Sequence, residues 1–180
     1  TSPMQTLTQR LANPTRFMDL SGKLLPFVFG AAAVLIAYGL YLVFFVAPAD
    51  YQQGETVKIM YIHVPSAWLA MMGYAICAMS SFGLLVFRHP LADVSAKAVV
   101  PIGAAFTFLA LVTGSLWGKP MWGAWWVWDA RLTSELILLF LYLGFIALHA
   151  SIDDPRRADR ASALLAIIGS VNVPIIYFSV

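Results

Sequence analysis

Charged side chains are scarce in this 180-residue sequence: 11% of the residues are Asp, Glu, Lys or Arg, whereas 61% are hydrophobic. Soluble domains contain roughly 25% charged and about 45–50% apolar residues. A water-soluble fold of this size could not hide so much apolar surface, because about a third of the area of its unfolded chain stays exposed after folding. The lipid bilayer is therefore the predicted solvent. The net charge of +2 is small and its basic residues are scattered, so no nucleic-acid partner is expected.

Cysteine and catalytic motifs are also nearly absent. The single cysteine, Cys77, lies within an apolar run, which excludes an intrachain disulfide and a cysteine metal cluster. There is no C-x-x-C-H motif for covalent haem attachment, and no phosphate-binding loop. No nucleophile–base pair and no carboxylates at catalytic spacing can be identified. The sequence therefore predicts a protein that is not an enzyme, and any ATP hydrolysis would belong to a partner.

Five apolar runs are long enough for membrane-spanning helices, since about 20 residues cross the roughly 30 Å hydrocarbon core. The predicted fold class is an all-α polytopic transmembrane bundle, forming a single domain over residues 1–180. Pro65 is expected in the first turn of the second span, and Asn172 and Pro174 are expected to kink the fifth. The chain does not begin with Met and stops inside an apolar run at Val180, so we expect a longer protein. The predicted spans are residues 24–46, 64–87, 98–116, 132–150 and 161–180.

Basic residues divide unequally between the two sets of connections. The N-terminal segment and the loops at 88–97 and 151–160 carry eight Lys or Arg residues, and the other side carries three. Lys and Arg are enriched in cytoplasmic loops. The N-terminus is therefore predicted to be cytoplasmic, and the loops at 47–63 and 117–131 are predicted to face outward. The eight are Arg10, Arg16, Lys23, Arg88, Lys97, Arg156, Arg157 and Arg160, and the three are Lys58, Lys119 and Arg131.

Five of the six tryptophans lie in the segment WGKPMWGAWWVWDARLT, residues 117–133. An aromatic belt at the membrane interface accounts for one or two tryptophans at a helix end, but not for four within seven residues. If the loop forms a short interfacial helix, Trp122, Trp125, Trp126 and Asp129 share one face. Such a face would be a flat apolar platform suited to a large planar ligand.

Charged residues flank this tryptophan segment. Lys119 and Arg131 could neutralise carboxylates on the ligand. Arg131 could equally contact lipid phosphate or pair with Glu135, which lies one turn inside the fourth span, where charges are costly and usually paired. Asp129 is expected to cap the fourth span by accepting backbone N–H bonds.

His63 is the only histidine on the predicted outward side. It lies at the N-terminal mouth of the second span, where the helix dipole disfavours imidazolium and helps keep the ring neutral and able to bind a metal. A lone interfacial histidine is more often a cap or a solvated side chain, but His63 shares its side with the tryptophans, which favours a ligand role. His89 and His149 lie on the other side. No two histidines face one another in mid-membrane, which argues against a b-type electron-transfer cytochrome.

At these residues the sequence resembles the tryptophan-rich, haem-handling membrane proteins, and most closely the haem exporter protein C family of bacterial cytochrome c maturation. The resemblance covers nearly the whole chain. It rests on WGKPMWGAWWVWDARLTSEL (117–136), APADYQQG (47–54), YIHVPSAW (61–68) and PIGAAFTFLALVTGS (101–115).

This resemblance implies six membrane helices in the bacterial inner membrane, and haem b held at the periplasmic face for transfer to a periplasmic haem chaperone. The implied partners are the permease and ATPase subunits of an ABC transporter and a small single-span membrane subunit. By position, His63 matches an axial ligand of the haem iron, while a second outward histidine and the sixth helix would follow Val180. The predicted haem-binding set is His63, Trp117, Lys119, Trp122, Trp125, Trp126, Trp128, Asp129 and Arg131.

Two alternatives remain open at this point. One is a haem lyase, or cytochrome c synthase subunit, of the same superfamily, which is longer and carries extra histidines on additional spans. The other is a structural subunit of a transporter, in which the tryptophan loop is only a docking surface. The structural alternative predicts no Soret absorbance, even after haem is added.

Overall fold

The structure is a computed structural model that describes residues 13–179. The chain divides into two compact units, Thr1–Pro48 and Ala49–Val180. Arg10, which contributed to the predicted orientation, and Val180, the end of the fifth predicted span, lie outside the described residues. The single domain expected over residues 1–180 stays a prediction.

The described part of the first unit is one long helix, α2 (Pro14–Tyr41), which continues into a π-helical turn, η1 (Leu42–Val46). Asn13 caps its start: the Asn13 side chain accepts hydrogen bonds from the backbone N–H groups of Thr15 and Arg16. Pro14 follows at a first-turn position, where a missing N–H has no intrahelical partner to lose.

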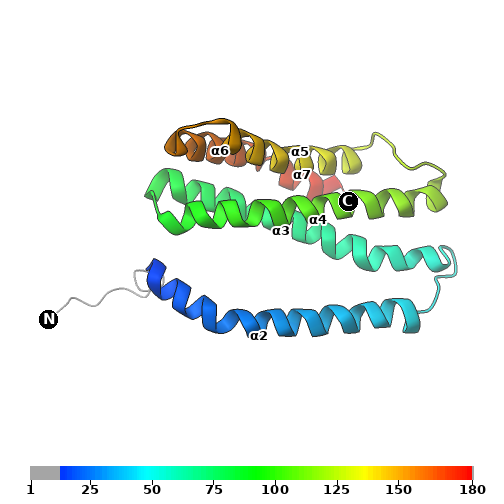
Figure 1. The fold of residues 1–180 in the computed structure, drawn as a ribbon. Coiled ribbons are helices and arrows are strands. Elements are labelled where there is room, and N and C mark those ends of the chain that lie inside the picture. The colour runs from blue at the N-terminus through cyan, green and yellow to red at the C-terminus, as the bar shows by residue number, and fades with distance from the viewer. Residues whose placement is uncertain (1–12, 180) are drawn as a thin grey trace. The chain divides into compact units, whose positions relative to one another are not determined.

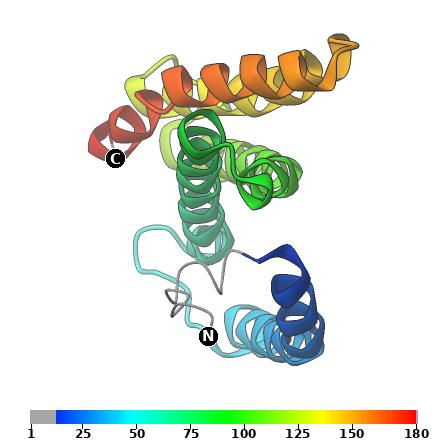
Figure 2. The same cartoon turned by 90° about the vertical axis from the view of Figure 1, so that its left-hand side faces the viewer.

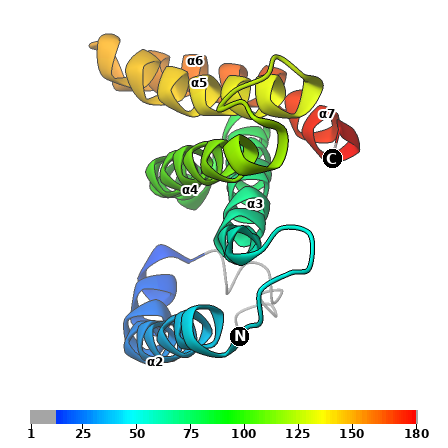
Figure 3. The ribbon, with the colours of Figure 1, turned by 90° about the vertical axis from the view of Figure 1, so that its right-hand side faces the viewer.

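The second unit is built from helices that pack in pairs. Helix α3 packs along α4, and α5 packs along α6, with α5 against α4 and α6 against α3. In Figures 1, 2 and 3 the α5–α6 pair lies on one side of the α3–α4 pair, and α7 extends beyond the end of α6. The elements are η2 (Glu55–Ile59), α3 (Met60–Phe87), α4 (Pro90–Trp122), α5 (Ala130–Ser151), α6 (Pro155–Gly169) and α7 (Asn172–Ser179).

The predicted all-α transmembrane fold is confirmed. Within residues 13–179, five helical segments are long and apolar enough to cross a membrane. Several extend beyond the predicted runs, because caps and polar first turns lengthen a helix without adding to its apolar run. The third, for example, begins directly after its cap, His89, which accepts a hydrogen bond from the Leu91 N–H. The sixth span implied by the resemblance is not among the described residues. The five segments are Pro14–Val46, Glu55–Phe87, Pro90–Trp122, Ala130–Ser151 and Pro155–Ser179.

Two details of the spans test the proline predictions. Pro65 lies inside α3 rather than in its first turn, because the helix already begins at Met60 after the η2 turn. The predicted kink in the fifth span is confirmed: α6 ends at Gly169 and α7 begins at Asn172. The Asn172 side chain donates a hydrogen bond of 2.9 Å to the Ser134 carbonyl on α5, which anchors the start of α7.

Close packing in the second unit depends on Gly103 of α4. A Cβ atom there would overlap the ring of Tyr142 on α5, so the tyrosine can cross α4 only above a glycine. The fully buried Tyr142 hydroxyl donates a 2.6 Å hydrogen bond to the Ala70 carbonyl on α3. Tyr74 meets the same ring edge-on, with ring centroids 5.3 Å apart. Small residues thus allow three helices to approach one another, as expected for packing in lipid.

An ionic cluster links α4, α5 and α6 at their predicted cytoplasmic ends. Lys97 lies 2.7 Å from Asp93 on its own helix and 2.8 Å from Asp159 on α6. Asp159 also lies 2.9 Å from Nε2 of His149 on α5. Asp159 therefore connects three helices through one carboxylate.

We expect Asp159→Asn to lower the free energy of unfolding by about 2 kcal/mol, because it weakens charge-assisted hydrogen bonds. Thermal unfolding in detergent, followed by circular dichroism, would measure the change. Asp153→Asn is the matched control, since Asp153 is exposed in the α5–α6 turn. Equal losses in the two variants would contradict the connecting role of Asp159.

Candidate functional site

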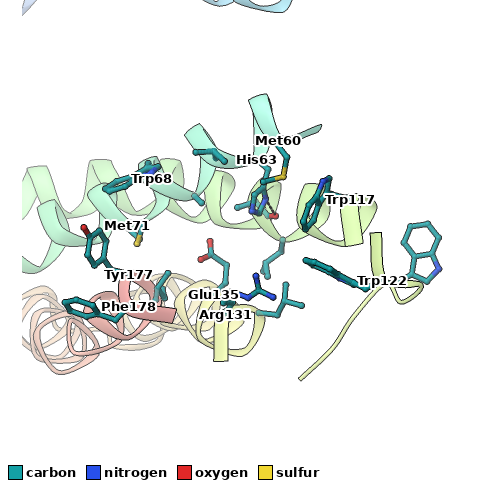
Figure 4. A pocket seen from close by; sticks show the side chains of 18 residues that line it. Met60, His63, Trp68, Met71, Trp117, Trp122, Arg131, Glu135, Tyr177 and Phe178 are labelled. Carbon is teal, nitrogen blue, oxygen red and sulfur yellow. Dashed lines mark hydrogen bonds between the residues drawn. The ribbon is translucent and has the colours of Figure 1, made fainter. Parts of the chain in front are cut away.

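A cavity of about 590 Å³ lies where α3, α4, α5 and α7 converge (Figure 4). Its volume is in the range of about 300–1,000 Å³ that is typical of small-molecule sites. Most of its wall is apolar or aromatic, and the chemically distinctive groups are one imidazole, one guanidinium and one carboxyl. The lining residues are Met60, His63, Val64, Ala67, Trp68, Met71, Ala110, Leu111, Gly114, Trp117, Trp122, Trp125, Arg131, Leu132, Glu135, Ile176, Tyr177 and Phe178.

His63 is held between α3 and α4 by one ring nitrogen. Its Nδ1 lies 2.9 Å from the Ala110 carbonyl oxygen and 3.1 Å from the Thr113 hydroxyl. A carbonyl oxygen can only accept, so Nδ1 carries the proton and donates it. The Thr113 hydroxyl donates to the Leu109 carbonyl, which leaves its own oxygen free to accept from Nδ1. The lone pair of Nε2 is therefore available to a ligand, in the tautomer that metal-binding histidines use.

The alternative interpretations of His63 are wrong. It does not cap α3, because that helix begins at Met60 and its cap residue, Ile59, makes no side-chain cap bond. It is not a solvated side chain either, since it is half-buried against α4. Gly114 makes this position possible, because a Cβ atom there would come within 3.1 Å of the His63 Cε1 atom. Nothing in the sequence pattern marks Gly114 for this role.

The tryptophan segment has no helix of its own, so the predicted short interfacial helix is wrong. Trp117 and Trp122 lie instead in the last turns of α4, which ends at Gly123. Gly123 has a φ of +78°, and its N–H closes the helix on the Lys119 carbonyl at 3.0 Å. A glycine in this left-handed conformation is a common helix stop. Residues 124–129 are not helical, so they cannot place four residues on one helical face.

The structure brings three of the five tryptophans to the cavity. Trp117 and Trp122 pack edge to face with centroids 4.6 Å apart, and both line the cavity together with Trp125. Trp126 and Trp128 pack on each other with centroids 5.4 Å apart, and neither lines the cavity. An aromatic wall is therefore present, built jointly by α4 and the following loop, but the Trp117 and Trp122 rings are perpendicular rather than coplanar.

The two predicted outward loops lie at the same end of the second unit. The indole nitrogen of Trp117 donates a 3.0 Å hydrogen bond to the side-chain oxygen of Gln53, which lies in the APADYQQG segment. Asp50 organises that segment by accepting hydrogen bonds of 2.9 Å from the N–H groups of Gln52 and Gln53. The first loop therefore supports the tryptophan wall from outside the cavity.

Arg131 pairs with Asp129 at 3.0 Å rather than with Glu135, so the expected ion pair inside the fourth span is wrong. The predicted cap is confirmed, since Asp129 accepts a 2.8 Å hydrogen bond from the Leu132 N–H. This bond, together with the Arg131 guanidinium, holds the pKa of Asp129 below its ordinary value. Arg131 also lies 5.5 Å from the centre of the Trp122 ring, in cation–π contact, and lines the cavity.

Lys119 lies beside the cavity without lining it. Its ammonium group donates a 3.1 Å hydrogen bond to the Gly123 carbonyl and is 5.9 Å from the centre of the Trp125 ring. Lys119 thus reinforces the end of α4, whereas Arg131 is the cation that reaches the cavity.

Glu135 also belongs to the site, although the sequence pattern predicts only an ion-pair role for it. It is 8% exposed, lines the cavity, and its Oε1 has no hydrogen-bond partner among the described residues. In Figure 4 the Glu135 carboxyl, from α5, and the His63 ring, from α3, both point into the cavity. The sequence shows that a carboxyl lies inside the span, but the arginine one turn earlier suggested a partner that it does not have.

Residues from α3 and α7 complete the wall. Met71 of α3 lines the cavity with His63 and Trp68, and it also packs against the buried core. Tyr177 and Phe178 of α7 could not have been assigned from the sequence, because their position follows from the break after Gly169.

The residues that the structure describes contain no group of three or more His, Cys, Asp or Glu side chains that could hold a metal ion. Any metal that bound Nε2 of His63 would have to bring further ligands with it. A metal already held in a flat organic framework meets this condition, and the tryptophan wall would contact such a framework.

Comparison with known proteins extends over almost the whole chain. A family model described as heme exporter protein C matches residues 7–180. A protein of that name from Bradyrhizobium diazoefficiens is 61% identical over 170 residues, which are 94% of this chain and 64% of the relative. The relative of the same name from Escherichia coli K12 is 53% identical over 176 residues, covering 98% of this chain and 71% of the relative. The chain thus spans less than two thirds of the length of the Bradyrhizobium relative.

Proposed function

Because this chain belongs to the haem exporter protein C family, we propose that it binds haem b in the cavity between α3, α4, α5 and α7. In this proposal it then passes the haem to a periplasmic haem chaperone during the maturation of c-type cytochromes. The observation that carries the proposal is the His63 ring, with Nδ1 fixed on the Ala110 carbonyl and Nε2 free in a tryptophan-lined cavity. Haem supplies four nitrogen ligands of its own, so one imidazole on this side of the iron suffices.

Each part of the cavity suits a different part of the haem. The rings of Trp117, Trp122 and Trp125 offer apolar surface for the porphyrin face. Arg131, held by Asp129 and Trp122, offers a fixed guanidinium for a haem carboxylate.

The remaining residues of the predicted haem-binding set lie outside the cavity lining. Trp126 and Trp128 pack on each other there, so we assign them no direct part in haem binding. Lys119 would hold the end of α4 in place, because it bonds the Gly123 carbonyl and contacts the Trp125 ring.

Delivery, rather than chemistry on haem, is the proposed role. The sequence has no phosphate-binding loop, so ATP hydrolysis would be done by the ATPase of an ABC transporter acting with its permease and a small single-span subunit. The uneven distribution of basic residues supports a cytoplasmic N-terminus and a periplasmic tryptophan wall in a bacterial inner membrane. The names of the relatives favour this role over that of a haem lyase.

Replacing Trp122 with leucine should weaken haem binding about tenfold, or about 1.4 kcal/mol, because it removes an aromatic wall and the support of Arg131. A haem titration of the detergent-purified protein, followed by Soret absorbance, would measure the affinity. Trp128→Leu is the matched control, since Trp128 is 76% exposed and outside the cavity. We expect that variant to stay within about twofold of the unchanged protein.

Two results would contradict the proposed function. Equal losses in Trp122→Leu and Trp128→Leu would show that the cavity is not where haem binds. If the wild-type protein showed no Soret absorbance after haem addition, the result would instead support the alternative that the chain is a structural docking subunit.

A further inference from the structure

Among residues 13–179, Glu135 is the carboxyl that lines the cavity, and it forms no ion pair with the arginine that lines the same cavity, Arg131, which pairs with Asp129 instead. The side chain is 8% exposed, and Oε1 has no hydrogen-bond partner among residues 13–179. A carboxylate in such a position is costly unless a cation or a set of donors reaches it. Such a carboxyl is either protonated or paired with a cation, so a cation that enters the cavity would favour its ionised form.

The two basic side chains in the cavity lining, His63 and Arg131, make their hydrogen bonds and ion pairs with groups other than Glu135. Arg131 is one helical turn away on α5, but its guanidinium is paired with Asp129 at 3.0 Å and lies over the Trp122 ring. His63 points into the same cavity, but its Nδ1 donates to the Ala110 carbonyl, so the ring is neutral while Nε2 is free to bind a metal. Neither group neutralises Glu135 as the protein stands.

Haem brings a charge that depends on the oxidation state of its iron. The porphyrin ring carries two negative charges, so the ferric iron–porphyrin core has a net charge of +1 and the ferrous core is neutral. A buried carboxylate in the same cavity attracts the ferric core much more strongly than it would in water, because the local dielectric constant is low. It offers no comparable attraction to the neutral ferrous core.

We propose that Glu135 is the counter-charge for ferric haem and gives the cavity its preference for ferric over ferrous haem. This inference rests on the proposed function, since it requires haem in the cavity. It assigns Glu135 a role in specificity that is separate from ligation by His63 and from carboxylate binding by Arg131. No electron transfer by the protein is involved, because the residue only changes the relative affinities for two states of one ligand.

The test compares ferric and dithionite-reduced haem in titrations of the unchanged protein and of Glu135→Gln. The glutamine keeps the shape of the side chain and removes its charge. We expect it to lower the ferric-to-ferrous affinity ratio at least tenfold, mainly through loss of ferric affinity. For a one-electron couple, a tenfold change corresponds to a positive shift of about 59 mV in the midpoint potential of the bound haem. A spectroelectrochemical titration would measure that shift directly.

Two further variants separate charge in the cavity from other effects. Glu55→Gln removes the same charge from an exposed side chain, 71% accessible and paired with Lys58, and should leave the ratio unchanged. Glu135→Asp keeps the charge and should retain more of the ferric preference than Glu135→Gln. Thermal unfolding of each variant checks that the bundle is intact.

The outcomes are distinguishable. An unchanged ratio in a folded Glu135→Gln protein would overturn the inference while leaving the proposed function in place. Equal losses of ferric and ferrous affinity would also overturn it, since Glu135 would then only pack against the ligand. If the unchanged protein bound haem in neither oxidation state, the proposed function itself would fail, and this inference would fail with it.

Discussion

Replacing His63 with alanine is expected to lower haem affinity at least about 100-fold, because removing even an outer partner of a metal ligand costs about 10–100-fold. The variant loses the Nε2 lone pair and keeps the surrounding wall of tryptophans. We expect residual haem to bind by stacking alone, with a Soret maximum that differs from that of the unchanged protein. Haem content after purification and the absorption spectrum would measure both effects.

His89→Asn is the matched control for this substitution. It removes a histidine at the other end of the helices, and asparagine keeps the ability to cap α4 as His89 does for the Leu91 N–H. The control should retain the haem content and the spectrum of the unchanged protein. If His63→Ala did the same, His63 would not be an iron ligand.

Gly103→Ala should strongly destabilise the second unit. The new Cβ atom would overlap the Tyr142 ring, which is fully buried and fixed by its hydrogen bond to the Ala70 carbonyl. Overpacking of this kind costs about 1–3 kcal/mol and more where the neighbour cannot move, so we expect a loss of about 3 kcal/mol. Equilibrium unfolding in mixed detergent would measure it.

The same methyl group at Gly83 provides the control, since a Cβ atom there would lie an ordinary 3.4 Å from Ala92. Adding Tyr142→Leu to Gly103→Ala should recover part of the loss, with a coupling energy of about 1 kcal/mol or more between the two positions. Strictly additive effects would show that the glycine is needed for some reason other than the tyrosine.

Much of the fold could be predicted because each span contains a continuous apolar run that is visible in the local sequence. The ends of the helices were harder to predict, because they depend on caps and turns with little apolar character. Three helices begin before their apolar runs for this reason: α2 starts after the cap residue Asn13, α4 starts after the cap residue His89, and α3 follows directly on the η2 turn. The kink before Asn172 was predictable because a proline and a polar side chain interrupt one span.

In the candidate site too, features that depend on local sequence could be predicted, and features that depend on the fold could not. His63 could be selected from the sequence because of its sidedness, and the tryptophans because of their density. The arrangement of the tryptophans could not, since Gly123 ends α4 and changes the geometry from one helical face to a helix end plus a loop. The predicted pairing of Arg131 with Glu135 was also wrong. Asp129 and Glu135 are both close to Arg131 in the sequence, and only the fold shows that Arg131 pairs with Asp129.

The length of α4 has a consequence for where the cavity lies relative to lipid. Its 33 residues give a rod of about 50 Å, whereas the hydrocarbon core is about 30 Å thick. A helix this long must tilt or project, and an end rich in indole rings favours the level of the lipid headgroups. Because Trp117 and Trp122 belong to the rod itself, a thicker or thinner bilayer would shift the depth of the whole aromatic wall. If haem binds in this cavity as proposed, membrane thickness would then affect how readily a soluble acceptor protein reaches the bound haem.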